Sequence, residues 1–383
     1  MPQNIPLAWK QLAHEPMRTF SAVAGIMAAV LLMWSQLGLL VAVQKSATSM
    51  HRKIEAGLVV THPHSTSMTK MQSFSSRALA RLLGHPSVKG VHEVYSARGD
   101  WKAPGGAPAR SILVYGMEPD CPMRLPGLEA SRSRLAQPDT VLFDAGSKDV
   151  FGPVVPALRK GEPFEAELDH RRVRAVGETA IGTTIEADGH LVTTRANFLR
   201  LFPARKPGLI ELGLVTLREG ADAEQARREC QAIVGPEARV LTKEGFLQFE
   251  LAYLRANHPV EFIFGAGSAV AFFIGFVIVY QILYTDVSSH LPQFATLKAM
   301  GFTDGYLLRI VLGQGVILSI LGFIPGTLLA FGVYAVLTSV TNLPIVPTWE
   351  RGFMLLGLTV LMCVLSGMLA VRKLRSADPA DVF

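Results

Sequence analysis

Three histidines near one another in the sequence are the residues whose type best suits metal chemistry. These are His51, His62 and His64, and the His62-Pro63-His64 spacing could place two imidazoles on one ion. A metal site needs further ligands, yet no second histidine cluster and no acidic partner at ligand spacing accompanies them. We therefore expect ordinary surface histidines and no metal site.

The carboxylates and short motifs do not indicate an enzyme. Asp144, Asp149 and Asp188 suit turns and helix caps better than acid-base catalysis. The chain has no Gly-x-x-x-x-Gly-Lys-Ser/Thr loop, no His-Glu-x-x-His and no Gly-x-Ser-x-Gly. These absences exclude an ordinary nucleotide-binding P-loop and two common hydrolase signatures. We expect a chain that is not an enzyme and does not hydrolyse ATP alone.

The composition predicts a membrane protein with a sizeable water-soluble part. Hydrophobic residues make up 49% of the 383 residues and charged residues only 18%, with a mean hydropathy of +0.31. A helix needs about 20 apolar residues to cross a bilayer. Four runs meet this length: Phe20–Val43, Phe262–Tyr284, Leu307–Leu337 and Phe353–Val371.

These runs predict an α-helical membrane protein of four transmembrane helices, with a large exported α+β domain inserted between the first and second. The insert alternates apolar strands, such as those predicted at Leu58–Thr61 and Leu209–Leu217, with helices, such as Asp222–Val234, and is large enough to bury its own core. The first helix is expected to continue out of the membrane as a stalk over Gln44–Ile54. The predicted divisions are a surface helix (1–18), first span and stalk (19–56), α+β domain (57–243), second stalk and span (244–284), central loop (285–306), third span (307–338), outer loop (339–350), fourth span (351–371) and tail (372–383).

Charge placement predicts the orientation. Basic residues lie before the first run, in the central loop and after the last run, whereas Ser339–Glu350 contains no Lys or Arg. The positive-inside rule then places both termini and the central loop in the cytoplasm, in a multi-pass plasma-membrane protein. The first run is too long for a cleaved signal peptide, so we expect it to be retained.

The four apolar runs contain almost no ionisable residue apart from Arg309. A proton-driven carrier would need ionisable side chains within the membrane, so their near absence argues against that class. Cys121 and Cys230 both lie in the exported insert, where a disulfide is permitted, but spacing alone does not decide whether they pair.

The central loop carries its own helix signals. Ser288 or Ser289 can cap a helix, Pro292 suits its first turn, and Gly301 suits its end. Apolar residues recur at helical spacing along it, at positions Leu291, Phe294, Leu297 and Met300. An apolar face on a short cytoplasmic helix predicts a docking partner.

The central segment reads Ala295-Thr296-Leu297-Lys298-Ala299-Met300-Gly301-Phe302, the chain opens with Leu7–Leu12 and Arg18-Thr19-Phe20, and it ends with Ala377–Asp381. These segments resemble the permease subunits of the MacB/FtsX class of ABC transporters. The DevC-type branch is most similar in Val279–Ser288 with His290-Leu291-Pro292, in Phe143-Asp144 and in Phe151-Gly152-Pro153. The resemblance covers nearly the whole chain. Gln293 departs from the Glu usual in DevC-like and MacB-like loops, which leaves a charged contact with the ATPase in doubt.

This resemblance implies a mechanism and partners. Two permeases would form a homodimer, and two separate ABC ATPase subunits, which bind ATP and Mg²⁺, would dock on the short central helix. The implied contact residues are Leu291, Gln293, Phe294, Leu297, Lys298, Met300, Gly301 and Phe302. ATP-driven closure would move the stalks, Gln44–Ile54 and Glu244–Leu254, and the insert, which becomes a periplasmic domain.

The resemblance also implies what the system does. It would export a lipid-like or amphiphilic cargo through a membrane-fusion adaptor and an outer-membrane duct, with no nucleic-acid partner. DevC-like permeases are associated with glycolipid export, but nothing in this sequence selects the cargo. The alternative is a mechanotransmitting module of the same class that activates a periplasmic partner without transporting anything.

Overall fold

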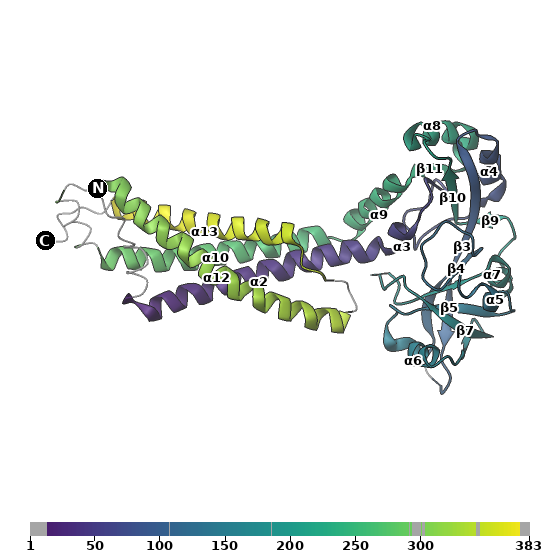
Figure 1. The fold of residues 1–383 in the computed structure, drawn as a ribbon, viewed down its shortest axis with the longest axis horizontal. Helices are drawn as coiled ribbons and strands as arrows, with labels where there is room; N and C mark the ends of the chain where they lie inside the picture. The colour runs from purple at the N-terminus through teal and green to yellow at the C-terminus, as the bar shows by residue number, and fades with distance from the viewer. Residues whose placement is uncertain are drawn as a thin grey trace. The chain divides into compact units, whose positions relative to one another are not determined.

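The computed structural model describes residues 14–106, 108–184, 186–290, 292, 300, 303–341 and 345–375 (Figure 1). The chain forms two compact units. One contains the long apolar helices and comprises residues 1–42, 260–340 and 345–383; the other contains the sheet and comprises residues 43–259 and 341–344.

The helical unit is built from four long helices, labelled in Figure 1: α2 (Pro16–Ala47), α10 (Val260–Ser289), α12 (Asp304–Thr341) and α13 (Trp349–Arg375). Each is long and apolar enough to cross a membrane. The predicted architecture of four spanning helices, with a large α/β domain between the first and second, is confirmed. Each helix extends beyond the apolar run that predicted it, because helical backbone bonding continues into the polar flanks.

Small residues allow the spanning helices to approach closely. A Cβ at Gly326 of α12 would lie 2.9 Å from the Met27 carbonyl oxygen of α2, and one at Gly322 would lie 2.5 Å from Ile26 Cγ2. The spacing Gly322-x-x-x-Gly326 places both glycines on one face of α12, as in other close membrane-helix pairs. The third span therefore packs closely against the first at these two glycines.

The second unit contains, within its described residues, a nine-stranded mixed sheet in the order β11-β1-β10-β3-β4-β8-β5-β7-β6. The strands are β1 (Leu58–Thr61), β3 (Val88–Lys102), β4 (Arg110–Met117), β5 (Thr140–Asp144), β6 (Phe164–Leu168), β7 (Arg171–Thr179), β8 (His190–Thr193), β10 (Leu212–Leu217) and β11 (Arg239–Thr242). A separate ribbon pairs β2 (Phe74–Ser75) with β9 (Leu209–Ile210).

Helices flank this sheet (Figure 1). They are α3 (Ser49–Lys53), α4 (Ser76–Ala80), α5 (Arg132–Leu135), α6 (Val154–Arg159), α7 (Arg195–Leu201), α8 (Ala223–Val234) and α9 (Lys243–Asn257), with 3₁₀ turns at Arg81–Gly84, Asp149–Phe151 and Gly235–Glu237. β1 shows why helices are needed on both sides: Leu58 and Val60 enter one hydrophobic core and Val59 the other. A strand buried on both faces is apolar throughout, as Leu-Val-Val is.

Sequence patterns located many of these elements but not all. β1 has the predicted bounds, whereas the strand predicted over Leu209–Leu217 divides into β9 and β10 at Glu211. The Glu211 carboxylate is buried and accepts the backbone N–H of Ser96 over 2.9 Å, so its side chain bonds to the neighbouring strand. β6, β8, β11 and α7 were not predicted.

The first stalk differs from its prediction as one helix over Gln44–Ile54. α2 ends at Ala47 and α3 begins at Ser49. The Thr48 hydroxyl between them donates to the Gln44 carbonyl over 2.8 Å, a back-bond that bends helices.

The two cysteines of the insert are not paired. Cys121 and Cys230 are both free and buried, and they belong to different hydrophobic cores.

Candidate functional site

The predicted ATPase-docking residues lie almost wholly outside the described residues. Leu291, Gln293, Phe294, Leu297, Lys298, Gly301 and Phe302 fall there, so their roles stay predictions. Met300 is described, and its side chain is 64% exposed.

A polar cluster lies immediately before this segment, around Asp286. The predicted apolar run ends at Tyr284, but α10 continues to Ser289. Asp286 is therefore a residue of this helix. Gln314 of α12 donates to Asp286 Oδ2 over 3.1 Å, and Arg18 Nη1 of α2 lies 3.8 Å from Oδ1. His290 Nδ1 lies 3.6 Å from the same oxygen. Asp286 therefore connects three spanning helices at the point where the central loop begins.

The spanning helices contain two buried ionisable residues outside the apolar runs, in which Arg309 was expected to be almost alone. Asp286 in α10 is 9% exposed and Arg351 in α13 is 8% exposed. Asp286 lies two residues after the second run and Arg351 two residues before the fourth, so the search of the runs did not include them. A buried carboxylate in an apolar setting needs polar partners, and the side chains around Asp286 supply them.

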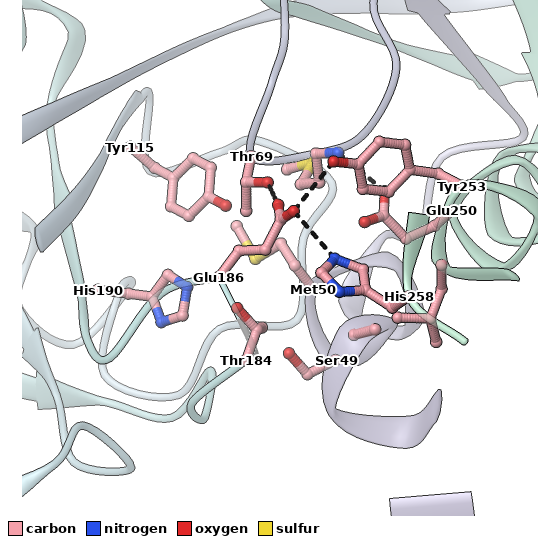
Figure 2. A pocket seen from close by; sticks show the side chains of 13 residues that line it. Ser49, Met50, Thr69, Tyr115, Thr184, Glu186, His190, Glu250, Tyr253 and His258 are labelled. Carbon is pink, nitrogen blue, oxygen red and sulfur yellow. Dashed lines mark hydrogen bonds and ion pairs between the residues drawn. The ribbon is translucent and has the colours of Figure 1, made fainter. Parts of the chain in front are cut away.

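A second polar cluster lies in the α/β unit and surrounds a small cavity of about 30 Å³ (Figure 2). The cavity lies between α3, α9, the loop after β1 and the loop before β8. Its volume suits one or two water molecules and excludes a metabolite-sized substrate. We call the contacts around it the stalk joint, because the predicted stalks meet the sheet domain there.

Glu186 is the centre of the stalk joint (Figure 2). Its carboxylate accepts from the Tyr253 hydroxyl over 3.0 Å and from the Thr69 hydroxyl, and it lies 3.5 Å from His258 Nε2. Lys70 Nζ lies 3.7 Å from the same carboxylate and donates to the Tyr253 hydroxyl over 2.6 Å. The hydrogen bond with Tyr253, followed by the charge of Glu186, raises the pKa of Lys70, so it remains a cation at neutral pH. These contacts connect the loop before β8 to α9.

Glu250 and His51 form a buried pair beside them. Glu250 Oε2 accepts the Met68 backbone N–H over 2.8 Å and lies 3.4 Å from His51 Nε2. The His51 ring also packs on Phe246, with ring centroids 4.4 Å apart. His51 is thus a buried residue that joins α3 to α9, and its prediction as a surface histidine is wrong.

Asp144 fixes the loop that carries Glu186. Its carboxylate accepts backbone N–H groups from Ile181 over 2.7 Å and Gly182 over 2.9 Å, and lies 3.3 Å from His190 Nδ1. Burial alone would raise the pKa of Asp144, but the hydrogen bond and charge of His190, with the backbone donors, hold it below its ordinary value. It also accepts from Gly146, two residues along the chain, which is the predicted turn role.

The side chains around the cavity include Glu186, Glu250, His190 and His258. Across the residues that the structure describes, no group of three or more His, Cys, Asp or Glu side chains could hold a metal ion. The Tyr115 phenol, which stacks on His190 with centroids 6.0 Å apart, has its pKa raised by burial and stays neutral. The arrangement is suited to holding loops and helices together.

Comparison with known proteins identifies part of the helical unit. Residues 265–379 match the family described as FtsX-like permease C-terminal, so the chain carries an FtsX-like permease domain. No curated protein matches the chain.

Two solved structures are similar to about half of the chain each. One is the periplasmic region of MacB from Actinobacillus actinomycetemcomitans, with 12% identity and a TM-score of 0.35, covering 51% of this chain and 94% of that one. The other is the extracellular domain of the noncanonic ABC-type transporter YknZ from Gram-positive bacteria, with 10% identity and a TM-score of 0.33, covering 49% of this chain and all of that one, 100%.

Proposed function

We propose that this chain is the permease subunit of an ABC-type exporter and couples ATP hydrolysis in a separate subunit to movement of its sheet domain. The observation that carries the proposal is the FtsX-like permease domain over residues 265–379, within a chain of four spanning helices and one large insert. The chain acts by transmitting motion and catalyses no reaction itself.

The ATPase docks on the central loop in this proposal. The loop, both termini and the ATPase, with its ATP and Mg²⁺, lie in the cytoplasm, and the sheet domain lies across the membrane. The cluster around Asp286 supports the proposal, because it connects α2, α10 and α12 where the loop begins. A movement of the loop would then reach three helices together.

The stalk joint supports the second half of the proposal. α9 leads directly to α10 along the chain, since α9 ends at Asn257 and α10 begins at Val260. Tyr253 and His258, at this end of the stalk, contact Glu186 of the sheet domain. A displacement of α9 would therefore pull on the loop before β8, which Asp144 anchors to the sheet.

The finer proposal includes the assembly and the cargo. Two copies form a homodimer, a membrane-fusion adaptor and an outer-membrane duct continue the route, and the cargo is an amphiphile, as in a DevC-type exporter. A module that activates a periplasmic partner without cargo would use the same joint, and the experiment separates the two.

The experiment is co-expression of the full chain with its genomic neighbours, followed by mild extraction and measurement of ATP hydrolysis. We expect an ATPase and an adaptor to co-purify, and the adaptor to stimulate turnover. Phe294→Asp or Leu297→Asp should abolish ATPase recruitment while membrane insertion is retained, whereas Phe294→Leu should recruit normally. Recruitment unchanged in both Asp variants would refute the docking site. A periplasmic hydrolase recovered in place of the adaptor would favour the signalling alternative.

A further inference from the structure

Three elements of the sheet unit each direct a polar side chain to the cavity at the stalk joint (Figure 2). Ser49 comes from α3, Tyr115 from β4 and Glu250 from α9. Figure 2 shows the Tyr115 hydroxyl pointing into the cavity. No direct hydrogen bond joins any two of these three side chains in the part of the chain that the structure describes.

The Tyr115 hydroxyl is buried and has no hydrogen-bond partner among the described residues. The side chain is 1% exposed, so bulk solvent does not reach the hydroxyl freely. Burial, followed by the charge of Glu250, raises the pKa of Tyr115, so the hydroxyl keeps its proton at neutral pH. A buried O–H group that donates to nothing is destabilising, and such groups in native proteins usually bind protein or ordered water.

Ser49 and Glu250 present further unsatisfied groups. Ser49 Oγ is buried and has no hydrogen-bond partner. Glu250 uses Oε2 to accept the Met68 N–H over 2.8 Å, and no described residue donates to its Oε1. The Glu250 side chain is 8% exposed, so Oε1 also lacks free access to solvent. The cavity therefore offers a phenol that donates, a carboxylate oxygen that accepts and a hydroxyl that can do either.

The volume of the cavity selects a very small occupant. About 30 Å³ exceeds the 10 to 15 Å³ or so that one water molecule needs, and it is far below the volume of a pocket for an organic ligand. A buried water typically makes about three hydrogen bonds to groups that are otherwise unsatisfied. A cation is disfavoured, because Lys70 already lies beside Glu186, and the described residues contain no group of three His, Cys, Asp or Glu ligands.

We propose that the cavity at the stalk joint binds one or two water molecules, which accept from the Tyr115 hydroxyl, donate to Glu250 Oε1 and bond with Ser49. Water-mediated hydrogen bonds are nearly as favourable as direct ones. The bound water thus joins β4 of the sheet to α3 and α9, which belong to the two predicted stalks. The inference goes beyond the proposed function, because it holds whether or not an ATPase drives the chain.

The first test compares two substitutions that remove a buried hydroxyl from the full chain in detergent. Tyr115→Phe should lower the melting temperature by about 2 to 4 °C, because the water and Glu250 lose a hydrogen-bond partner. Thr61→Val is the matched control. Thr61 Oγ1 is also buried without a partner, but Thr61 does not line this cavity, so its loss should leave the melting temperature unchanged or raise it. Tyr115→Phe behaving like Thr61→Val would overturn the site.

A double-substitution cycle tests whether one occupant connects the side chains. Tyr115 and Ser49 share no direct hydrogen bond, so any coupling between them passes through the cavity. Ser49→Ala should lower the melting temperature less in the Tyr115→Phe background than in the wild type. The intrinsic effect of alanine on α3 cancels in this cycle. Strictly additive shifts would contradict a shared water.

A crystal structure of the full chain at about 2 Å resolution identifies the occupant. Density at about 2.6 to 3.2 Å from the Tyr115 hydroxyl and from Glu250 Oε1 would confirm the water, and an empty cavity would refute it. Melts in sodium, potassium and calcium chloride distinguish water from an ion. A difference between wild type and Tyr115→Phe that is the same in all three supports water, whereas a difference that grows with one cation alone would show an ion site instead. None of these measurements involves ATPase recruitment, so failure here is distinct from failure of the proposed function.

Discussion

The hydroxyl of Tyr253 in α9 donates to the carboxylate of Glu186 over 3.0 Å and accepts from Lys70 over 2.6 Å. One side chain of the stalk is thereby joined to two loops of the sheet domain. Because the bond is polar and directional, it holds a particular register between helix and loop, which general apolar packing does not.

Tyr253→Phe removes this bond while keeping the ring. We expect the free energy of unfolding to fall by about 1 kcal/mol, the net value of one hydrogen bond. ATP-driven export should fall further than ATP hydrolysis, because the motor is intact and the joint is loosened. Thermal unfolding and paired transport and hydrolysis assays measure the two effects. Tyr280→Phe in α10 is the control, and equal losses of export in both variants would contradict the joint.

Asp144 predicts a pH dependence of stability. Its folded-state pKa lies below the ordinary value near 4, so its contribution is present above that value and is lost as pH falls through the folded pKa. Asp144→Asn should cost about 1 to 3 kcal/mol at neutral pH, and the difference from wild type should shrink below about pH 4. Thermal melts across this range test it. Asp188→Asn, at an exposed ion pair with Lys148, should show little effect, and a pH-independent Asp144→Asn penalty would refute the assignment.

Asp286 predicts a link between the helical unit and the central loop. Asp286→Leu removes the acceptor for Gln314 and the partner of Arg18, so we expect destabilisation of about 1 to 3 kcal/mol. Stimulated ATP hydrolysis should fall as well, because the loop is no longer joined to α2 and α12. Unfolding in detergent and the ATPase assay report these effects. The exposed Glu350→Leu should behave as wild type, and normal coupling in Asp286→Leu would rule out the link.

The unpaired cysteines lead to a prediction about their reaction with iodoacetamide. Cys121 and Cys230 are unpaired, and burial, with the nearby charges of Asp120 and Glu118, raises the pKa of the Cys121 thiol to about 12. Native protein should therefore react slowly with iodoacetamide at Cys121. Protein denatured without reductant should gain three labels in intact-mass measurement, one per cysteine. A single label would instead show a disulfide between two of them.

Sequence patterns predicted the elements whose formation depends mainly on residues close together in the sequence. Leu58–Thr61 forms β1 with the predicted bounds, and the Asp222 side chain caps α8 by accepting the Gln225 N–H over 2.8 Å. Each depends on neighbouring residues, so periodicity and capping rules suffice. β6 was missed because Phe164-Glu-Ala-Glu-Leu168 carries two carboxylates, and its strand conformation depends on pairing with β7 and β3.

The amino-acid sequence by itself determined the four spanning helices and the insertion of one large domain. The length of an apolar run is a local property, and it decides whether a helix can span the hydrocarbon core of a bilayer. Only the tertiary structure decided which polar residues matter. Tyr253 and Glu186 are 67 residues apart, and Asp144 and His190 are 46 apart. His51 was expected to be a surface residue of a polar stalk and Arg351 to be the first residue of the fourth span, yet both are buried. Burial of a charge depends on which distant segments pack around it, and no local spacing contains that information.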